Sequence, residues 1–392
     1  MMLGQNHMSE LIQFSGDSAS IRNQPVEKGF LVHIECASGD EAYEVGRTNQ
    51  KAMLGSVRAE NAPQYRFTRE DSLVNLRAAD LRGIHTYPHD IHMKGLGGND
   101  HQYLIASSEV TRTYEADGIE TVRAPESGVA CLTVTAGFHE QSGQTVESAT
   151  EAAYTKLFEK VQELRMHPLR IWNYMPNIND GADSEGNGAS ELYKQFNAGR
   201  HKAWQAYDPD FSEVCSATGI GNTNPYKGID ITCLATKHPV IHLDNPNQIP
   251  FLQYDAERFG VQPCSRRGTI HLTPGGIEIY ISGTASITGQ DNRFAGDIEP
   301  KDIRMQTRQT LENIQALVSQ ENLAAYVSVD QDIPEYQLAD LKALRVYIRN
   351  EEDLPIIQEE LEAAGIPANQ IMYLKADICR KLLDIEIEAM IV

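Results

Sequence analysis

The sequence predicts an α+β protein in which one arrangement of strands and helices occurs twice. Its 392 residues are more than one ordinary core accommodates, which favours two or three domains, or one large core with an internal duplication. Each half of the chain shows strand-like segments, a long helix, another strand and another helix, in that order. This order is typical of an antiparallel sheet with helices packed on one face.

The first half is predicted to span residues 28–215, after a polar leader at residues 1–27. Turn signals such as Glu126-Ser-Gly128 separate its strands. Ser148 is suited to cap the long helix, since Glu151 follows three residues later and apolar residues then recur at helical spacing. The expected strands cover residues 30–36, 65–67, 103–113, 128–136 and 169–174, and the expected helices residues 148–166 and 189–207.

The second half is predicted to span residues 216–392 and to repeat this order. A run of small and polar residues between Ser212 and Gly228 marks the passage into it. The expected strands cover residues 229–235, 240–242, 269–272, 276–285, 344–348, 371–374 and 383–392, and the expected helices residues 304–319 and 354–364.

The C-terminal strand carries an acidic residue at every second position. Asp384, Glu386 and Glu388 fall on one face and apolar residues on the other, because side chains alternate along a strand. Either this acidic face is solvated, as one face of many antiparallel sheets is, or one of the carboxyl groups lines a pocket. Burial would raise the pKa of a carboxyl group in such a pocket and suit it to general acid catalysis near neutral pH.

The composition argues against several classes of function. A net charge of −21 is unfavourable for binding nucleic acid, whose phosphates require a basic surface. The six cysteines form no C-x-x-C pair, so neither a disulfide framework nor a zinc site is expected. The sequence shows no signal-like segment and no apolar run of membrane-spanning length. We therefore expect a cytoplasmic protein with no membrane partner, as a monomer or a small homo-oligomer.

Two groups of residues are candidates for binding an anionic small molecule. Tyr193, Asn197 and Arg200 share one face of a predicted helix, where Arg200 is able to hold a carboxylate through two hydrogen bonds. Arg266 and Arg267 form a second cationic point at the start of a strand. The alternative for each arginine is a structural role, in a helix cap or a surface ion pair.

Other motifs give weaker indications. His85, His89 and His92 have the spacing of a metal-binding helix face, but Pro88 and the surrounding glycines oppose a helix there. No complete dinucleotide or phosphate-binding fingerprint occurs, and the G-x-S-x-G pattern of serine hydrolases is absent from the sequence. The sequence therefore predicts no metal site, nucleotide site or serine nucleophile.

Four motifs carry a resemblance to a known family. They are Arg170-Ile-Trp-Asn-Tyr-Met-Pro-Asn-Ile-Asn179, Tyr193-Lys-Gln-Phe-Asn-Ala-Gly-Arg200, Glu278-Ile-Tyr-Ile-Ser-Gly-Thr-Ala-Ser-Ile287, and residues 376–389 with their Ile-Glu-Ile-Glu-Ala ending. In these motifs the sequence resembles the chorismatases, which remove the enolpyruvyl group from chorismate. The resemblance implies two YjgF/RidA-like (chorismate-mutase-like) domains in one chain, each a mainly antiparallel sheet with helices on one face. It also implies an active site made largely by the C-terminal half.

The resemblance further implies a role for individual residues. The catalytic glutamate of the family falls on Glu386, which would protonate the enolpyruvyl methylene carbon. The implied substrate-binding residues are Tyr193, Arg200, Tyr254 and Arg266, and the residues implied to tune the product are Ala285 and Cys379. No metal or organic cofactor is implied. The product is left open among a dihydroxy-cyclohexadiene carboxylate, 3-hydroxybenzoate, 4-hydroxybenzoate and a mixture.

Two other functions remain open at this level. The same arginines would suit a non-catalytic protein that binds an anionic metabolite. An imine deaminase of the YjgF/RidA type is the third possibility, given the implied fold. Release of pyruvate from chorismate separates the first function from the other two.

Overall fold

The computed structural model describes most of the chain from residue 111 onward and five strand segments before it. The described ranges are 31–36, 53–59, 90–93, 95–98, 101–106, 111–115, 118–137, 144–182, 191–222, 228–273, 276–327 and 333–392. The predicted leader, the expected strand at residues 65–67, and His85 and His89 lie outside these ranges. Only the backbone of His92 is described, in a strand.

The first seven-stranded sheet has the order β19-β10-β9-β11-β8-β7-β6. Its pairs are antiparallel except β9 with β10, which run parallel. Its elements are β6 (Thr111–Tyr114), β7 (Ile119–Ala124), β8 (Val129–Gly137), α3 (Val146–Leu164), β9 (His167–Pro176), α4 (Leu192–Tyr207), β10 (Ser216–Asn222), β11 (Gly228–Thr236) and β19 (Asp377–Ile378).

The second seven-stranded sheet has the order β12-β13-β14-β20-β17-β18-β4. Here too one pair is parallel, β17 with β18. Its elements are β4 (Gly95–Gly98), β12 (Val240–Leu243), β13 (Gly268–Thr273), β14 (Gly276–Ala285), α6 (Ile303–Val318), α7 (Gln320–Ala324), β17 (Lys342–Ile348), α8 (Leu354–Ala363), β18 (Ile371–Lys375) and β20 (Ile385–Ile391). A separate four-stranded sheet contains β1 (Leu31–Cys36), β5 (His101–Ala106), β2 (Met53–Ala59) and β3 (Asp90–Met93).

The two large sheets repeat one topology. Along the chain, β7-β8-α3-β9-α4-β10-β11 corresponds to β13-β14-α6-β17-α8-β18-β20. In both sheets the fifth strand of this series lies between the second and the third, and the third and fourth strands are the parallel pair. The prediction of a mainly antiparallel α+β arrangement present twice is therefore confirmed.

The division between the two repeats differs from the predicted boundary at residue 216. β10 and β11 follow that residue, yet both pair within the first sheet. The first repeat extends to Thr236 because its fifth strand, β11, must return between β8 and β9. Small segments are also exchanged, since β4 extends the second sheet and β19 extends the first. Within the small, polar run that suggested the passage between the halves, residues 216–222 form β10.

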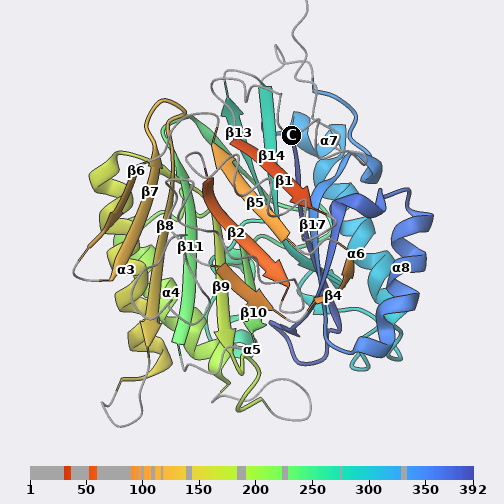
Figure 1. The fold of residues 1–392 in the computed structure, drawn as a ribbon. Helices are drawn as coiled ribbons and strands as arrows, with labels where there is room; N and C mark the ends of the chain where they lie inside the picture. Colours follow the sequence, from red (N-terminus) through yellow and green to blue (C-terminus); the bar gives the residue numbers. More distant parts are fainter. Residues whose placement is uncertain are drawn as a thin grey trace, which may run out of the picture.

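The two large sheets face each other, with their helices on the outer surfaces (Figure 1). α3 and α4 cover the first sheet and share a core with it. α6 and α8 cover the second sheet in the same way. A further apolar cluster fills the space between the sheets and contains Leu169 and Leu234 of the first and Tyr280 and Met390 of the second. Residues between the sheets are therefore shielded from water on both sides.

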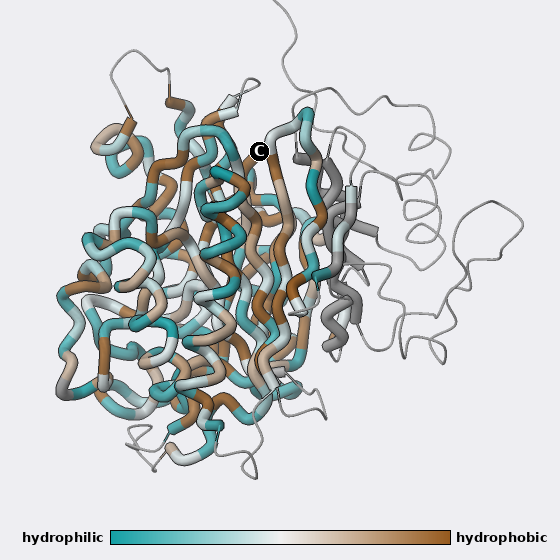
Figure 2. Tube along the Cα trace, turned by 90° about the vertical axis from the view of Figure 1, so that its left-hand side faces the viewer, coloured by the Kyte–Doolittle hydropathy of each residue, from teal (hydrophilic) through white to brown (hydrophobic). Residues whose placement is uncertain are grey.

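The helices form largely where expected, with one correction at a cap. α3 begins after Thr145, whose side chain accepts a hydrogen bond from the Ser148 backbone N–H. The Ser148 side-chain oxygen in turn accepts a hydrogen bond from the Thr145 backbone N–H. Ser148 is thus the third residue of the helix rather than its cap. Figure 2 shows hydrophobic stretches along the strands and hydrophilic stretches on the outer helices. In the described part of the chain, no helix is both long and apolar enough to cross a membrane.

Candidate active site

The acidic face at the C-terminal strand is buried rather than solvated. Asp384, Glu386 and Glu388 expose 0 %, 3 % and 4 % of their surface. Ile385 and Ile387 on the opposite face pack into the core beneath α6 and α8. The alternation along the strand therefore directs Glu386 and Glu388 toward the first sheet, whereas Asp384, just before the strand, contacts residues of the second repeat.

Asp384 has a structural environment. Its carboxylate lies 2.8 Å from Lys301 Nζ and 3.8 Å from Arg349 Nε, and it accepts a hydrogen bond from Asn350 Nδ2. Its backbone N–H donates to Gln306 on α6. These contacts fasten the start of β20 to the helix that covers it.

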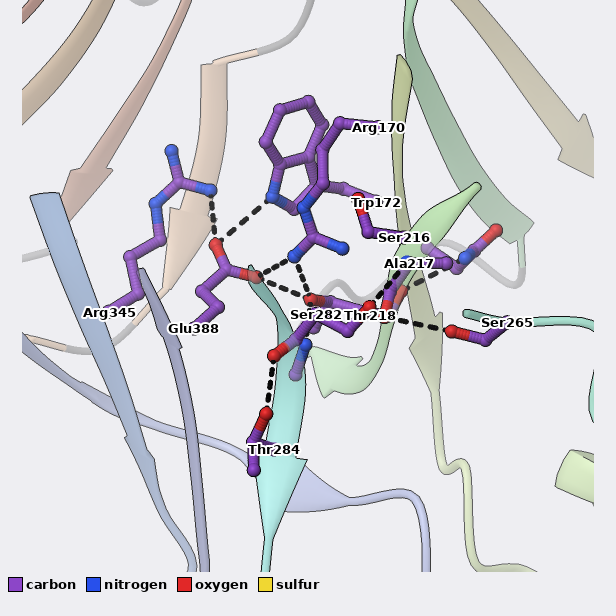
Figure 3. Close-up of polar contacts among 12 residues, drawn as sticks. Arg170, Trp172, Ser216, Ala217, Thr218, Ser265, Ser282, Thr284, Arg345 and Glu388 are labelled. Atoms are coloured by element: carbon purple, nitrogen blue, oxygen red, sulfur yellow. Dashed lines mark hydrogen bonds and ion pairs between the residues drawn. The ribbon is translucent and has the colours of Figure 1, made fainter. Parts of the chain in front are cut away.

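Glu388 is held in a buried ion cluster between the sheets (Figure 3). Arg345 Nη1 lies 2.7 Å from Oε1, and Arg170 Nη2 lies 2.8 Å from Oε2. Trp172 Nε1 donates to Oε1 at 3.0 Å, and the Thr218 hydroxyl donates to Oε2 at 2.5 Å. Burial alone would raise the pKa of Glu388, but Arg345 and Arg170 outweigh it and lower the pKa below its usual value. Glu388 is thus a carboxylate with its charge balanced.

Glu386 has the opposite environment. The described residues give its carboxyl group no ion pair, and the one hydrogen bond to it comes from Cys379 Sγ, 3.6 Å from Oε2. Burial raises the pKa of Glu386 to about 8, and the nearby charge of Glu388 adds to this effect. Glu386 is therefore protonated at neutral pH and able to donate its proton.

The Glu386 carboxyl group lines a cavity. The cavity lies where α4 and β10 of the first repeat meet β14 and β20 of the second. Its described walls include Tyr193 and Arg200 from α4, Ala217 and Gly219 from β10, Gly283 and Ala285 from β14, Tyr254, Ser265, Arg267, Cys379 and Arg380. The family resemblance assigned a role to seven residues, and all of them except Arg266 lie around this cavity. Their roles remain predictions.

Arg200 is a buried cation in the cavity wall. Its Nη2 donates to Asn197 Oδ1 at 2.8 Å, and its guanidinium lies 4.9 Å from the centre of the Phe196 ring. Among the described residues its Nε has no hydrogen-bond partner, so these residues leave one donor of Arg200 unsatisfied. Burial raises the pKa of Tyr193, so that its hydroxyl remains a hydrogen-bond donor beside Arg200. Together these two residues offer N–H and O–H groups to an anion.

The second cationic point in the cavity is Arg267, not Arg266. Arg267 Nη2 donates to the Tyr254 hydroxyl at 2.6 Å. Burial alone would raise the pKa of Tyr254, but Arg267 and Arg380 outweigh it and lower the pKa. Arg266 instead pairs with Asp244 at 2.6 Å and is absent from the described cavity wall. Substrate binding by Arg266 stays a prediction, and Arg267 is the neighbour whose side chain lines the cavity.

The alternation of side chains explains why Arg267 lines the cavity and Arg266 does not. In β13, Ile270 packs toward α6, whereas Thr269 bonds to the Ser216 backbone N–H of the first sheet. Odd-numbered residues therefore face the other sheet, and Arg267 extends this series. The sequence signal for this orientation is the pair of apolar residues Ile270 and Leu272, which alternate with the residues that face the other sheet. Arg380 carried no comparable signal, because a loop places it in the wall, where Gln290 and Asn292 accept its hydrogen bonds.

Ala285 and Cys379 lie next to Glu386 in the cavity wall. Ala285 is the residue that pairs with Glu386 between β14 and β20. Burial and the neighbouring Glu386 raise the pKa of Cys379, so its thiol stays protonated and donates to the carboxyl group. Both side chains are small, so a larger residue at either position would narrow the space beside Glu386. In the described part of the chain, no cluster of three or more histidine, cysteine or acidic residues is placed to hold a metal ion.

Comparison with known proteins places this chain in a family. Residues 104–235 match the family model "Chorismatase FkbO/Hyg5-like, N-terminal". A 3-hydroxybenzoate synthase of Streptomyces hygroscopicus is 34 % identical over 251 residues, which cover 62 % of this chain and 69 % of the relative. The chain belongs to the chorismatase family. A chorismatase of Streptomyces rapamycinicus is 29 % identical over 282 residues, which cover 70 % of this chain and 77 % of that one.

The fold agrees with this membership. A crystal structure of a chorismatase matches with a TM-score of 0.70 and 22 % identity, covering 93 % of this chain and 98 % of the other. The match extends over both repeats, so the arrangement of two sheets with outer helices is shared with that chorismatase.

Proposed function

We propose that this chorismatase cleaves the enolpyruvyl ether of chorismate and releases pyruvate. The observation that carries the proposal is the buried Glu386 carboxyl group, protonated at neutral pH, in a cavity whose other described charged groups are the guanidiniums of Arg200, Arg267 and Arg380. Chorismate is a dicarboxylate with an acid-sensitive enol ether. Its charge matches the arginines, and its ether requires a proton donor.

The proton would go from Glu386 to the methylene carbon of the enolpyruvyl group. Carbon is a poor proton acceptor, so the acid must be protonated, close and shielded from water. Transfer leaves an oxocarbenium ion beside the Glu386 carboxylate. Attack on this ion by water or by the neighbouring ring hydroxyl leads to loss of pyruvate. Glu386 recovers its proton at the end of the cycle.

Arg200 and Arg267 are proposed to hold the two carboxylates of the substrate. They project from α4 and from the start of β13, so they approach the cavity from different repeats. Charge-assisted hydrogen bonds of this kind fix both ends of a rigid substrate and orient the enol ether toward Glu386. Local arginines are needed because the net charge of −21 opposes long-range attraction of a dianion.

We propose 3-hydroxybenzoate as the ring product, since a relative 34 % identical to this chain is a 3-hydroxybenzoate synthase. Chorismate has the composition of 3-hydroxybenzoate plus pyruvate, so this outcome consumes no water. A dihydroxy-cyclohexadiene carboxylate requires one water molecule, and 4-hydroxybenzoate is the third outcome. Ala285 and Cys379 are proposed to influence the choice by limiting how the ring sits beside Glu386.

Incubation of the purified protein with chorismate tests the function. Pyruvate is measured by a coupled dehydrogenase assay, and the ring product is identified by chromatography with mass detection. We expect catalytic release of pyruvate with an equal amount of 3-hydroxybenzoate. Pyruvate no faster than spontaneous decay would overturn the proposal. Tight binding of intact chorismate would then indicate a binding protein, and ammonia release from 2-iminoacids an imine deaminase.

A further inference from the structure

Gly283, on β14, lies directly against the Glu386 carboxyl group. A Cβ atom added to Gly283 would lie 1.9 Å from Glu386 Oε1 and 2.9 Å from its Cδ, far inside van der Waals contact. The φ angle of Gly283 is outside the left-handed region, so the backbone conformation does not require glycine. An added Cβ atom would therefore displace the carboxyl group, which is the far end of the Glu386 side chain, from its present position.

The strand pairing places Gly283 at this position. β14 pairs regularly with β20 as far as Ile281, and the register shifts before Thr284 resumes the pairing. Gly283 lies within this irregularity, two residues before Ala285, which pairs with Glu386. Bulges of this kind re-aim side chains next to active sites. Here the irregularity brings the backbone of β14 beneath the Glu386 carboxyl group.

Thr218 of β10 holds this piece of backbone. The Gly283 N–H donates to Thr218 Oγ1 at 3.0 Å. The Thr218 hydroxyl donates its own proton to Glu388 Oε2 at 2.5 Å and also accepts a bond from Arg170 Nη2. The one proton of the hydroxyl is committed to Glu388 (Figure 3). The hydroxyl is therefore fixed as an acceptor for the Gly283 N–H. The ion cluster of Glu388 is thus connected to the position of Glu386.

We propose that Gly283 and Thr218 are positioning residues for proton donation by Glu386. Gly283 keeps open the space that the Glu386 carboxyl group occupies, and Thr218 anchors the bulge to the Glu388–Arg170 ion pair. The inference rests on the proposed role of Glu386 in chorismate cleavage. In this inference Glu388 and Arg170 do not contact the substrate but hold the Thr218 hydroxyl in place.

The first test is Gly283→Ala, compared with Gly268→Ala in the adjacent strand. A Cβ atom at Gly268 would meet flexible side-chain atoms of Leu317 and Leu243 at 3.3 and 3.4 Å, which can yield. We expect Gly283→Ala to lower kcat by about 100-fold or more, as when a general acid is misplaced, and to change KM much less. Gly268→Ala should keep kcat within about threefold of wild type. A kcat for Gly283→Ala within the same range would overturn the inference.

A double-mutant cycle tests the contact without relying on activity. Gly283→Ala is made in the wild-type background and in the Glu386→Ala background, and the melting temperature of each variant is measured. We expect a loss of several degrees with Glu386 present and a clearly smaller loss without it. Equal losses in the two backgrounds would show that Gly283 does not accommodate Glu386. This result stands even if the wild-type protein releases no pyruvate, so failure of the function and failure of the contact are distinguishable.

The role of Thr218 is tested by Thr218→Val and Thr218→Ser. Valine keeps the shape and removes the hydroxyl, whereas serine keeps the hydroxyl. We expect valine to lower kcat by about tenfold or more and to move the alkaline limb of the pH profile toward lower pH, because a displaced carboxyl group is better solvated. Serine should restore both. Thr310→Val, which removes a buried hydroxyl bonded within α6, is the control for general destabilisation. Equal kcat and pH profiles for the valine and serine variants would overturn the role.

Discussion

Glu386 and Glu388 are two residues apart on the same face of β20, yet their surroundings have opposite effects. Glu388 meets two guanidinium groups, an indole N–H and a hydroxyl, and its pKa is lowered. Glu386 meets a thiol and the edge of a cavity, and its pKa is raised to about 8. Both side chains are buried, so burial alone does not decide the protonation state. The presence or absence of a paired cation decides it.

Both repeats contribute residues to the surroundings of these two glutamates. The cations that neutralise Glu388 come from both sheets, Arg170 from β9 and Arg345 from β17. Glu388 therefore joins the repeats electrostatically, at a cost in desolvation that its partners offset. Glu386 lies at the same interface between the two repeats, where a cavity separates them. β20 thus supplies both Glu388, which pairs with cations of both sheets, and Glu386, the proposed general acid.

The largest expected effect is the loss of activity in Glu386→Gln. The amide has nearly the same shape as the protonated acid but cannot donate the required proton. We expect kcat for pyruvate release to fall by about 10²–10⁴-fold, with the free energy of unfolding near that of wild type at pH 6. Steady-state assays and chemical denaturation measure the two quantities. Activity within about threefold of wild type would remove Glu386 from the mechanism.

Glu388→Gln is expected to affect chiefly stability. The substitution leaves two buried guanidinium groups without their carboxylate and should lower the free energy of unfolding by about 3–5 kcal/mol. Chemical denaturation is the measurement. Glu360→Gln is a matched control, because Glu360 pairs with the more exposed Arg304 and Arg308 and its loss should cost much less. An equal loss in the free energy of unfolding for the two variants would contradict the role of Glu388 as a buried ion pair that joins the two sheets.

The two adjacent arginines provide the next comparison. Arg267→Met removes a charged hydrogen-bond donor from the cavity and should raise KM for chorismate by about 10–100-fold. Arg266→Met removes the ion pair with Asp244 and should leave KM within about threefold of wild type. Steady-state kinetics of the two variants decide between them. A larger effect on KM from Arg266→Met than from Arg267→Met would instead support the sequence prediction for Arg266.

The smallest effect is the pH dependence of wild-type kcat. Since the protonated form of Glu386 is the proposed active form, kcat should be constant below its pKa and fall as the pH rises through about 8. A pH–rate profile on the purified enzyme measures this limb. A limb near the usual carboxyl pKa of 4.5 would indicate that Glu386 is ionised in the enzyme.

The two glutamates should also give opposite pH dependences of stability. The folded-state pKa of Glu386 is raised, so the stability it contributes is fully present below its unfolded value of 4.5 and is lost as the pH rises through about 8. The pKa of Glu388 is lowered, so its contribution is present above 4.5 and is lost as the pH falls through the folded value. Denaturation of each Gln variant beside wild type, from pH values well below 4.5 up to pH values above 8, separates the two slopes. Parallel slopes would contradict the assignment.

Several features followed from the sequence because they depend on local patterns. Strand and helix periodicity gave the α+β class and the repetition. The alternation of acids and isoleucines in the last strand placed Glu386 and Glu388 on one face. Helical spacing placed Tyr193 and Arg200 on one side of α4, and both line the cavity. The family motifs then distinguished Glu386 from its neighbour.

The tertiary structure decided what distant segments bring together. No local pattern indicates that Arg170 and Arg345 meet Glu388, or that Arg267 rather than Arg266 faces the cavity. The boundary between the repeats also depended on pairing, because β11 returns into the first sheet. The sequence determined which residues share a face, since that follows from the geometry of each backbone segment. The protonation states of the two glutamates depend on which charges lie across the interface, and only the packing of the two sheets sets that.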